Sequence, residues 1–269
     1  GYLSLSKVRY PEVKEKKPTG IADIMKIPKE NREFTIFSLF YGIWCMGWVV
    51  VIPNVNVLMI RYLGLSYSMI ALYQNSQLIM MLLGYWVWPR YIQKYGPLPV
   101  IKISLVPLMM LPLFWLLIEK NNHMLMIPIM MTYGLGISGV ILSANTYLYE
   151  LLPKDRRGPA YMSFWSALVF LAQGIGPRIA SVILDTTKGV FLKVGFFNIN
   201  NIKIALLSVC FYFVASFFIL AFLRGSRGIS SFVLVDQLFR RSPITMAYNM
   251  FLLERSDDEY SRADAVKKL

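Results

Sequence analysis

The sequence predicts an all-α membrane protein with six transmembrane helices, and three observations lead to this prediction. Hydrophobic residues make up 56% of the chain and charged residues only 16%, whereas soluble domains carry about 25% charged residues. The charges gather between apolar stretches of about 20 residues or more, the length that a helix needs to cross a bilayer core of about 30 Å. Alternating segments of about ten residues, typical of transmembrane β-barrels, are not seen.

The six apolar stretches set the predicted domain organisation. They are residues 34–60, 62–89, 98–118, 124–149, 159–184 and 204–223. Only Lys102 and Arg178 interrupt them. Backbone polar groups inside lipid must be satisfied within their own segment, so each stretch is expected to be a helix. Residues 1–33 then form a cytoplasmic linker, 34–223 the transmembrane domain, and 224–269 a cytoplasmic tail.

The basic residues predict the orientation. The side that holds both chain ends carries 22 Lys and Arg residues, and the opposite side carries 5. Cytoplasmic loops are enriched in Lys and Arg, so both termini are expected in the cytoplasm. The net charge of +13 is explained in this way rather than by nucleic-acid binding, because the basic residues lie between apolar stretches and not along one helix face.

Other classes of chemistry have little support. Cys45 and Cys210 lie within apolar stretches and form no metal-binding or disulfide pattern. An enzyme embedded in the membrane needs clustered His, Cys or carboxylate side chains in its spans, and none is found, so we expect no enzyme, cofactor or metal. His123, in a short external loop, is expected to be an ordinary surface residue.

The segments outside the spans are polar. Residues 7–20 are charged and contain two prolines, which favours an extended or disordered linker. Residues 20–29 fit a short amphipathic helix at the membrane surface. In the tail, helices near 232–241 and 256–269 compete with a simple solvated tail, which we favour.

Two cytoplasmic connections resemble those of the major facilitator superfamily. Residues 88–100 are similar to its loop motif Gly-x-x-x-Asp-Arg-x-Gly-x-Arg/Lys. Lys94 and Gly96 match the basic residue and the later glycine, while Pro89 and Gln93 replace the usual glycine and aspartate. In the family the acidic residue locks neighbouring helices by charge pairing. Gln93 cannot do so as an anion, which weakens the inference of gating.

The second resemblance covers residues 145–161. The pattern P-x-x-x-R-G-x-A, which here includes Arg156 and Arg157, is followed by Gly176-Pro177. This is similar to the junction between the family's tenth and eleventh helices. The family is built from two six-helix halves joined by a cytoplasmic linker. The resemblance implies that this chain is the C-terminal half, that an N-terminal half is its missing partner, and that a three-plus-three repeat relates residues 34–118 to 124–223.

Polar side chains within the spans are the candidate site residues, because they are costly in lipid and usually face a cavity or another helix. The candidates placed between the midplane and the outer surface are Asn54, Gln74, Gln77, Gln173 and Arg178. Amides suit substrates with hydroxyl or carbonyl groups, since they both donate and accept hydrogen bonds. The competing explanation is that they join helices to one another. Likewise, Gly134, Gly136 and Gly139 favour close helix packing over a hinge.

Arg178 has two interpretations. It can bind an anionic substrate or a carboxylate of the missing half, or it can extend to the outer interface near Asp185. No Asp or Glu lies deep in a span, so an acid that couples transport to protons is expected in the absent half.

The function expected from the resemblance is secondary active transport of a small solute by alternating access, in the bilayer of a bacterial inner membrane. The alternative is a sensor or assembly partner with the same fold and a signalling tail. The sequence leaves open whether the chain is a fragment or a six-span protein that dimerises.

Overall fold

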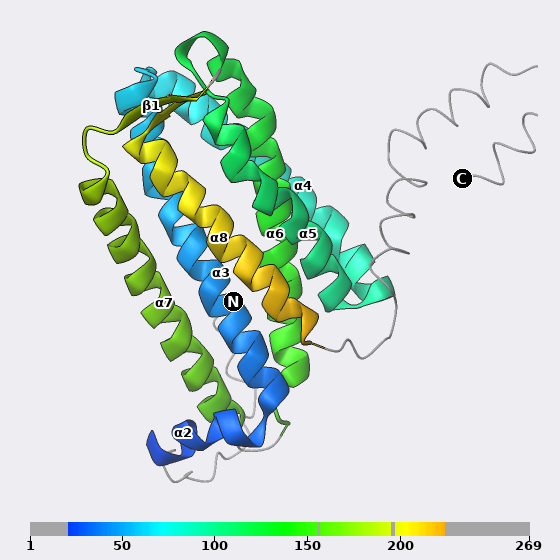
Figure 1. Ribbon diagram of the computed structural model, residues 1–269. Coiled ribbons are helices and arrows are strands. Elements are labelled where there is room, and N and C mark those ends of the chain that lie inside the picture. Colours follow the sequence, from blue (N-terminus) through cyan, green and yellow to red (C-terminus); the bar gives the residue numbers. More distant parts are fainter. Residues whose placement is uncertain (1–20, 155–156, 195–196, 224–269) are drawn as a thin grey trace, which may run out of the picture.

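Long helices account for nearly all of the residues that the computed structural model describes, which are residues 21–154, 157–194 and 197–223 (Figure 1). The α-helices are α2 (Ile21–Glu30), α3 (Arg32–Val57), α4 (Tyr67–Tyr95), α5 (Pro97–Leu116), α6 (Met126–Leu151), α7 (Gly158–Thr186) and α8 (Asn201–Ala221). A π-helical turn, η1 (Leu58–Tyr62), extends α3, and a 3₁₀ segment, η2 (Lys120–Leu125), precedes α6.

In the part of the chain that the structure describes, five helical segments are long and apolar enough to cross a membrane. They are Arg32–Tyr62, Pro97–Leu116, Lys120–Leu151, Gly158–Thr186 and Asn201–Ala221. The expected all-α membrane bundle is therefore confirmed. The sixth long helix, α4, has 29 residues, about 43 Å at 1.5 Å per residue. It is long enough to cross, but the amides of Gln74, Asn75 and Gln77 make it more polar than the other five helices. We assign it as a membrane span because of its length and its position within the bundle.

Two glycines explain where α4 differs from the predicted stretch of 62–89. Gly64 has a φ of +67° and interrupts the chain after η1, and the Ser66 side chain then accepts a hydrogen bond from Met69 N at the start of α4. At the other end, α4 continues past Pro89 to Tyr95, where Gly96 adopts a φ of +86°. Such backbone favours glycine, and α5 begins at the next residue.

The predicted linker and the predicted tail lie mostly outside the residues that the structure describes. A helix, α2, is present where a surface helix was predicted, and it lies across the end of the bundle opposite the strands (Figure 1). Residues 1–20 and the tail of 224–269 lie outside the described residues, so the linker and tail assignments stay predictions.

The connection between α7 and α8 contains a hairpin that the sequence analysis did not predict. Strand β1 (Phe191–Val194) pairs antiparallel with β2 (Phe197–Asn200), with Leu192 opposite Ile199. Asn200 then caps α8, because its Oδ1 accepts a hydrogen bond from Lys203 N at 2.9 Å. The hairpin therefore fixes the start of the last helix.

The helices pack in a pattern that repeats after three helices. The central helix α3 packs against α7 and α8, while the central helix α6 packs against α4 and α5. If α3 is exchanged with α6, α4 with α7 and α5 with α8, the contacts of α3 become the contacts of α6. The contact between α5 and α8 is unchanged by the exchange. This is the relationship that a three-plus-three repeat gives, although residue identity between the triplets is not visible.

The three glycines of α6 serve close packing. A Cβ added at Gly136 would lie 2.8 Å from Leu108 Cγ of α5, and one at Gly139 would lie 2.9 Å from the Trp88 ring of α4. At Gly134 it would overlap the backbone of Gln77. Small residues allow such approaches between membrane helices. The packing interpretation of these glycines is supported.

Candidate functional site

The predicted amide Gln74 is joined to α3 by a hydrogen bond. Its Nε2 donates to Asn56 Oδ1 at 3.0 Å, and Gln74 is exposed on the bundle surface. The NH₂ group of Asn56 and Oε1 of Gln74 have no partner among the described residues. Asn56 was not among the residues selected from the sequence, because a pairing between two helices cannot be read from spacing within one.

The end of α3 that carries Asn56 is not a regular α-helix. Pro53 lies inside α3, and the π-helical turn of η1 follows. Asn54 is buried, and its Nδ2 donates to Val50 O at 2.7 Å. This bond returns the amide to the backbone of its own helix, one turn back. For Asn54, the geometry favours shaping the end of the helix over contact with a solute.

A second link between α3 and α4 lies nearer the other end. Tyr85 of α4 lies near Tyr41 of α3. Gln74 and Tyr85 are eleven residues apart, which places them on one face of α4 at 100° per residue. The backbones of α3 and α4 approach each other closely at few positions. The two helices are therefore connected mainly by side chains from these facing surfaces.

Helix α7 contributes to the same side of α3. The Trp165 ring lies 5.3 Å from the Tyr41 ring, centroid to centroid. The predicted candidate Gln173 lies beside the Cys45 thiol. Tyr41 and Cys45 are one turn apart, so both contacts lie along one face of α3. Gln77, by contrast, is half-buried against α6, where its backbone meets Gly134.

Arg178 lies on an exposed stripe of α7 that is composed mainly of small and polar side chains. The stripe comprises Ser163, Ala167, Phe170, Gly174, Arg178 and Ser181. A separate exposed stripe, about 100° away around the helix, is wholly apolar and comprises Leu171, Ile175, Ile179 and Val182. Gln173 lies between the face that packs on α3 and the polar stripe. The polar stripe is thus turned away from the surface best suited to lipid.

The nearest acid in sequence does not neutralise Arg178. Asp185 forms an exposed ion pair with Lys188, with Nζ 2.8 Å from Oδ1. This hydrogen bond raises the pKa of Lys188. Among the described residues, Arg178 itself makes no hydrogen bond or ion pair, so both interpretations of Arg178 stay open.

A buried ion pair at the hairpin end of the bundle was missed by the sequence analysis. Lys203 is fully buried, and its Nζ donates to Glu119 Oε1 at 2.8 Å and to Leu116 O at 3.0 Å. Tyr62 donates to the second oxygen of Glu119 at 3.2 Å, and its ring lies 5.3 Å from the ammonium. Lys203 is one of the five basic residues that the sequence analysis counted on the side opposite the termini, because it adjoins the apolar stretch of 204–223.

His123 belongs to a second contact at the same end of the bundle. Tyr73 OH lies 2.7 Å from His123 Nδ1, which connects α4 to η2. The expectation that His123 is an ordinary surface residue was wrong, because the histidine is half-buried and bonded to a buried tyrosine. In the part of the chain that the structure describes, no group of three His, Cys, Asp or Glu side chains could hold a metal ion.

The sequence model of the Major Facilitator Superfamily matches residues 37–253, most of the chain. The chain belongs to this superfamily. Neither a curated protein sequence nor a solved structure matched it. Superfamily members are transporters of small molecules that sit in the lipid bilayer, so a transporter-type role and an integral membrane location follow.

The superfamily's cytoplasmic loop motifs can now be placed. Gly96 makes the one-residue turn between α4 and α5, which explains the glycine at this position of the superfamily motif. Gln93 and Lys94 are exposed near the end of α4, and the Lys94 ammonium lies 5.1 Å from the Tyr95 ring. Arg157 forms an ion pair with Glu30 of α2 at 3.5 Å. Arg156 lies outside the described residues.

Proposed function

We propose that this chain is the C-terminal six-helix half of a secondary active transporter, which moves a small solute by alternating access against an N-terminal half. The basic linker, the six long helices and the repeated packing pattern support this assignment. The solute pathway is proposed to follow the sides of α3, α4 and α7 on which Asn56, Gln74 and Gln173 lie.

The observation that carries the proposal is the exposed hydrogen bond between Asn56 and Gln74. Polar groups in a span are costly unless they face a partner or a water-filled cavity. Here Gln74 Nε2 donates to Asn56 Oδ1, while the NH₂ group of Asn56 and Oε1 of Gln74 stay available to a solute. Such a pair can exchange its hydrogen bonds for those of a solute as the two halves rock.

The charged residues near the proposed pathway limit the kinds of solute that it can bind. Among the described residues, α4 contains no carboxylate, Glu33 of α3 accepts a hydrogen bond from Tyr147, and Asp185 of α7 is paired with Lys188. The proposed pathway therefore offers little counter-charge to a cation. Amides and tyrosine hydroxyls suit a neutral solute with hydroxyl or carbonyl groups. Arg178 extends this range to anions if the polar stripe of α7 faces the pathway. A proton-coupling acid is proposed to reside in the N-terminal half.

The same proposal fixes the location. The 22 basic residues on one side and 5 on the other support a cytoplasmic position for both termini. We propose the bacterial inner membrane as the host bilayer, on the resemblance of the chain to bacterial uptake and efflux carriers.

Reconstitution tests the proposal. The chain, expressed with whatever sequence precedes it in its own gene, is placed in vesicles. Uptake is then measured for a panel of neutral and anionic solutes, with and without proton and sodium gradients. We expect gradient-dependent flux of at least one neutral hydroxylated solute or anion. Absence of flux for the whole panel, from protein shown to be folded, would count against the proposal.

A further inference from the structure

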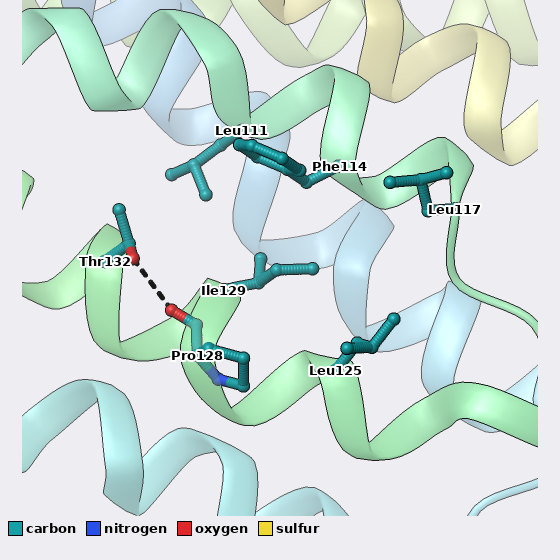
Figure 2. Close-up of a pocket in the computed structure, with 7 residues that line it drawn as sticks. All are labelled: Leu111, Phe114, Leu117, Leu125, Pro128, Ile129 and Thr132. Carbon is teal, nitrogen blue, oxygen red and sulfur yellow. Dashed lines mark hydrogen bonds between the residues drawn. The ribbon is translucent and has the colours of Figure 1, made fainter.

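A cavity of about 340 Å³ lies between α5 and α6, away from the proposed pathway (Figure 2). Its lining residues are Leu111, Phe114, Leu117, Leu125, Pro128, Ile129 and Thr132. Small-molecule pockets in proteins range from about 300 to 1,000 Å³, so the cavity can hold a slender ligand or part of a larger one.

The sequence of α6 explains why the cavity exists. Helices α5 and α6 touch closely where α6 carries Gly136 and Gly139, opposite Leu108 and Ser104. One turn towards the hairpin end, α6 carries Thr132 and then Ile129, whose side chains line the cavity instead of closing it. Figure 2 shows side chains of both helices directed at the space between them.

The cavity offers a ligand no polar partner of its own. Its one hydroxyl, Thr132 Oγ1, donates to Pro128 O at 2.8 Å within the same helix (Figure 2). Leu111 and Ile129 are buried and form the floor, whereas Phe114, Leu117 and Leu125 are exposed at the opening. Both helices are among those long and apolar enough to cross the membrane, so this opening faces hydrocarbon.

One end of the cavity is closed by the connection that runs from Leu117 to Leu125. Within that connection Glu119 is occupied by Lys203 at 2.8 Å, and its neighbour Lys120 is exposed, without a partner among the described residues. The exposed charge of this connection is therefore the positive charge of Lys120, which a ligand outside the protein can contact. An apolar slot in a membrane span, with a cation at its end, matches a lipid whose phosphate lies at the interface.

We propose that this cavity is a binding site for one acyl chain of a phospholipid from the leaflet on the hairpin side, with the lipid phosphate beside Lys120. The site is independent of transport and of the N-terminal half. Its lining residues take no part in the proposed pathway.

The test uses the full chain in vesicles of phosphatidylethanolamine and phosphatidylglycerol with a trace of phospholipid that carries a diazirine in one acyl chain. After illumination, labelled positions are mapped by mass spectrometry. Labelling of 111–117 and 125–132 should exceed that at the exposed Phe211 and Phe218 of α8 by about fivefold, equivalent to about 1 kcal/mol of preferential occupancy. Equal labelling of the cavity and of α8 would overturn the proposal.

Variants in which a larger side chain fills the cavity distinguish a specific lipid site from general contact with lipid. Ile129→Trp and Thr132→Phe should reduce cavity labelling to the α8 level, whereas the matched change Phe218→Trp should leave it unaltered. Persistent cavity labelling in a folded filled variant would refute the proposal. If neither of these variants folds, the ratio of cavity labelling to α8 labelling in the unsubstituted chain decides whether the site exists.

A second probe identifies the headgroup contact. A diazirine fatty alcohol lacks the phosphate, so Lys120→Glu should lower phospholipid labelling several-fold and leave alcohol labelling unchanged. Loss of both labels, or of neither, would overturn the role of Lys120. Lys193, which is exposed on β1, provides the matched charge control as Lys193→Glu.

Discussion

The Lys203 ammonium lies 2.8 Å from Glu119 Oε1 and is completely buried, although the two residues are 84 positions apart in the chain. The bond ties the start of α8 to the end of α5, and Tyr62 ties the end of α3 to the same carboxylate. Three of the long helices are thus joined at one end of the bundle by a single acid. A buried charge is tolerated only when paired, so this contact has strong consequences for stability.

Substitutions at the pair are expected to have unequal effects. Glu119→Gln leaves a buried ammonium without a counter-charge and should cost about 3 kcal/mol of folding free energy, in line with broken buried pairs. Lys203→Met should cost less, because the half-buried Glu119 carboxylate can be reached by water. Thermal unfolding in detergent measures both variants. A milder effect of Glu119→Gln than of Lys203→Met would contradict this account.

Two controls belong to that experiment. The double variant Glu119→Gln with Lys203→Met should recover much of the lost stability, because no unpaired charge is left. Asp185→Asn breaks an exposed pair with Lys188 and should leave the unfolding temperature unchanged. Additive losses in the double variant would show that the two residues act separately.

Gly139 and Gly174 form a matched pair for testing helix packing. A Cβ at Gly139 would lie 2.9 Å from the Trp88 ring, whereas one at Gly174 meets nothing within 4 Å. Gly139→Ala is therefore expected to destabilise the bundle by about 1–3 kcal/mol, typical of overpacking. Gly174→Ala should be neutral or stabilising by up to about 1 kcal/mol, because alanine favours helix. Unfolding of the two variants in the same detergent gives the comparison, and equal stability would argue against close packing at Gly139.

The positions of the helices were predictable because lipid imposes a length and a composition on each span. Boundaries shifted where local geometry decided: α4 starts after Gly64 and Ser66 rather than at residue 62, and it passes through Pro89. The hairpin of β1 and β2 was missed because four-residue strands leave little pattern. The crossing by α4 is the weakest in composition, since its amides serve contacts and not lipid.

Pairings within the candidate site were less predictable. Gln74 and Gln173 were selected for their chemistry, but their neighbours Asn56 and Cys45 lie on another helix, and sequence periodicity says nothing about contacts between helices. Lys203 was misjudged for a related reason. Its burial depends on Glu119 and on Leu116 O, which only the packing of α5 against α8 brings near.

Gln74 should matter to solute binding more than its neighbour Asn75. Both are exposed amides on α4, but they point about 100° apart, and only Gln74 bonds to α3. In the reconstituted transporter, Gln74→Leu is expected to raise KM about tenfold, the effect of losing about 1.4 kcal/mol of binding. Asn75→Leu should change KM little. Equal effects of the two substitutions would place the pathway elsewhere.

Arg178 provides the clearest test of the polar stripe on α7. If the stripe faces the pathway or the N-terminal half, Arg178→Ala should abolish flux of an anionic solute, and Arg178→Lys should restore part of it because a cation returns without the bidentate geometry. If Arg178 instead extends to the outer interface, both variants should transport normally. Initial rates measured over a range of solute concentrations distinguish the two. The matched control is Ser181→Ala on the same stripe, which removes a polar group without removing charge. Normal affinity and rate in Arg178→Ala would end the pathway interpretation of this residue.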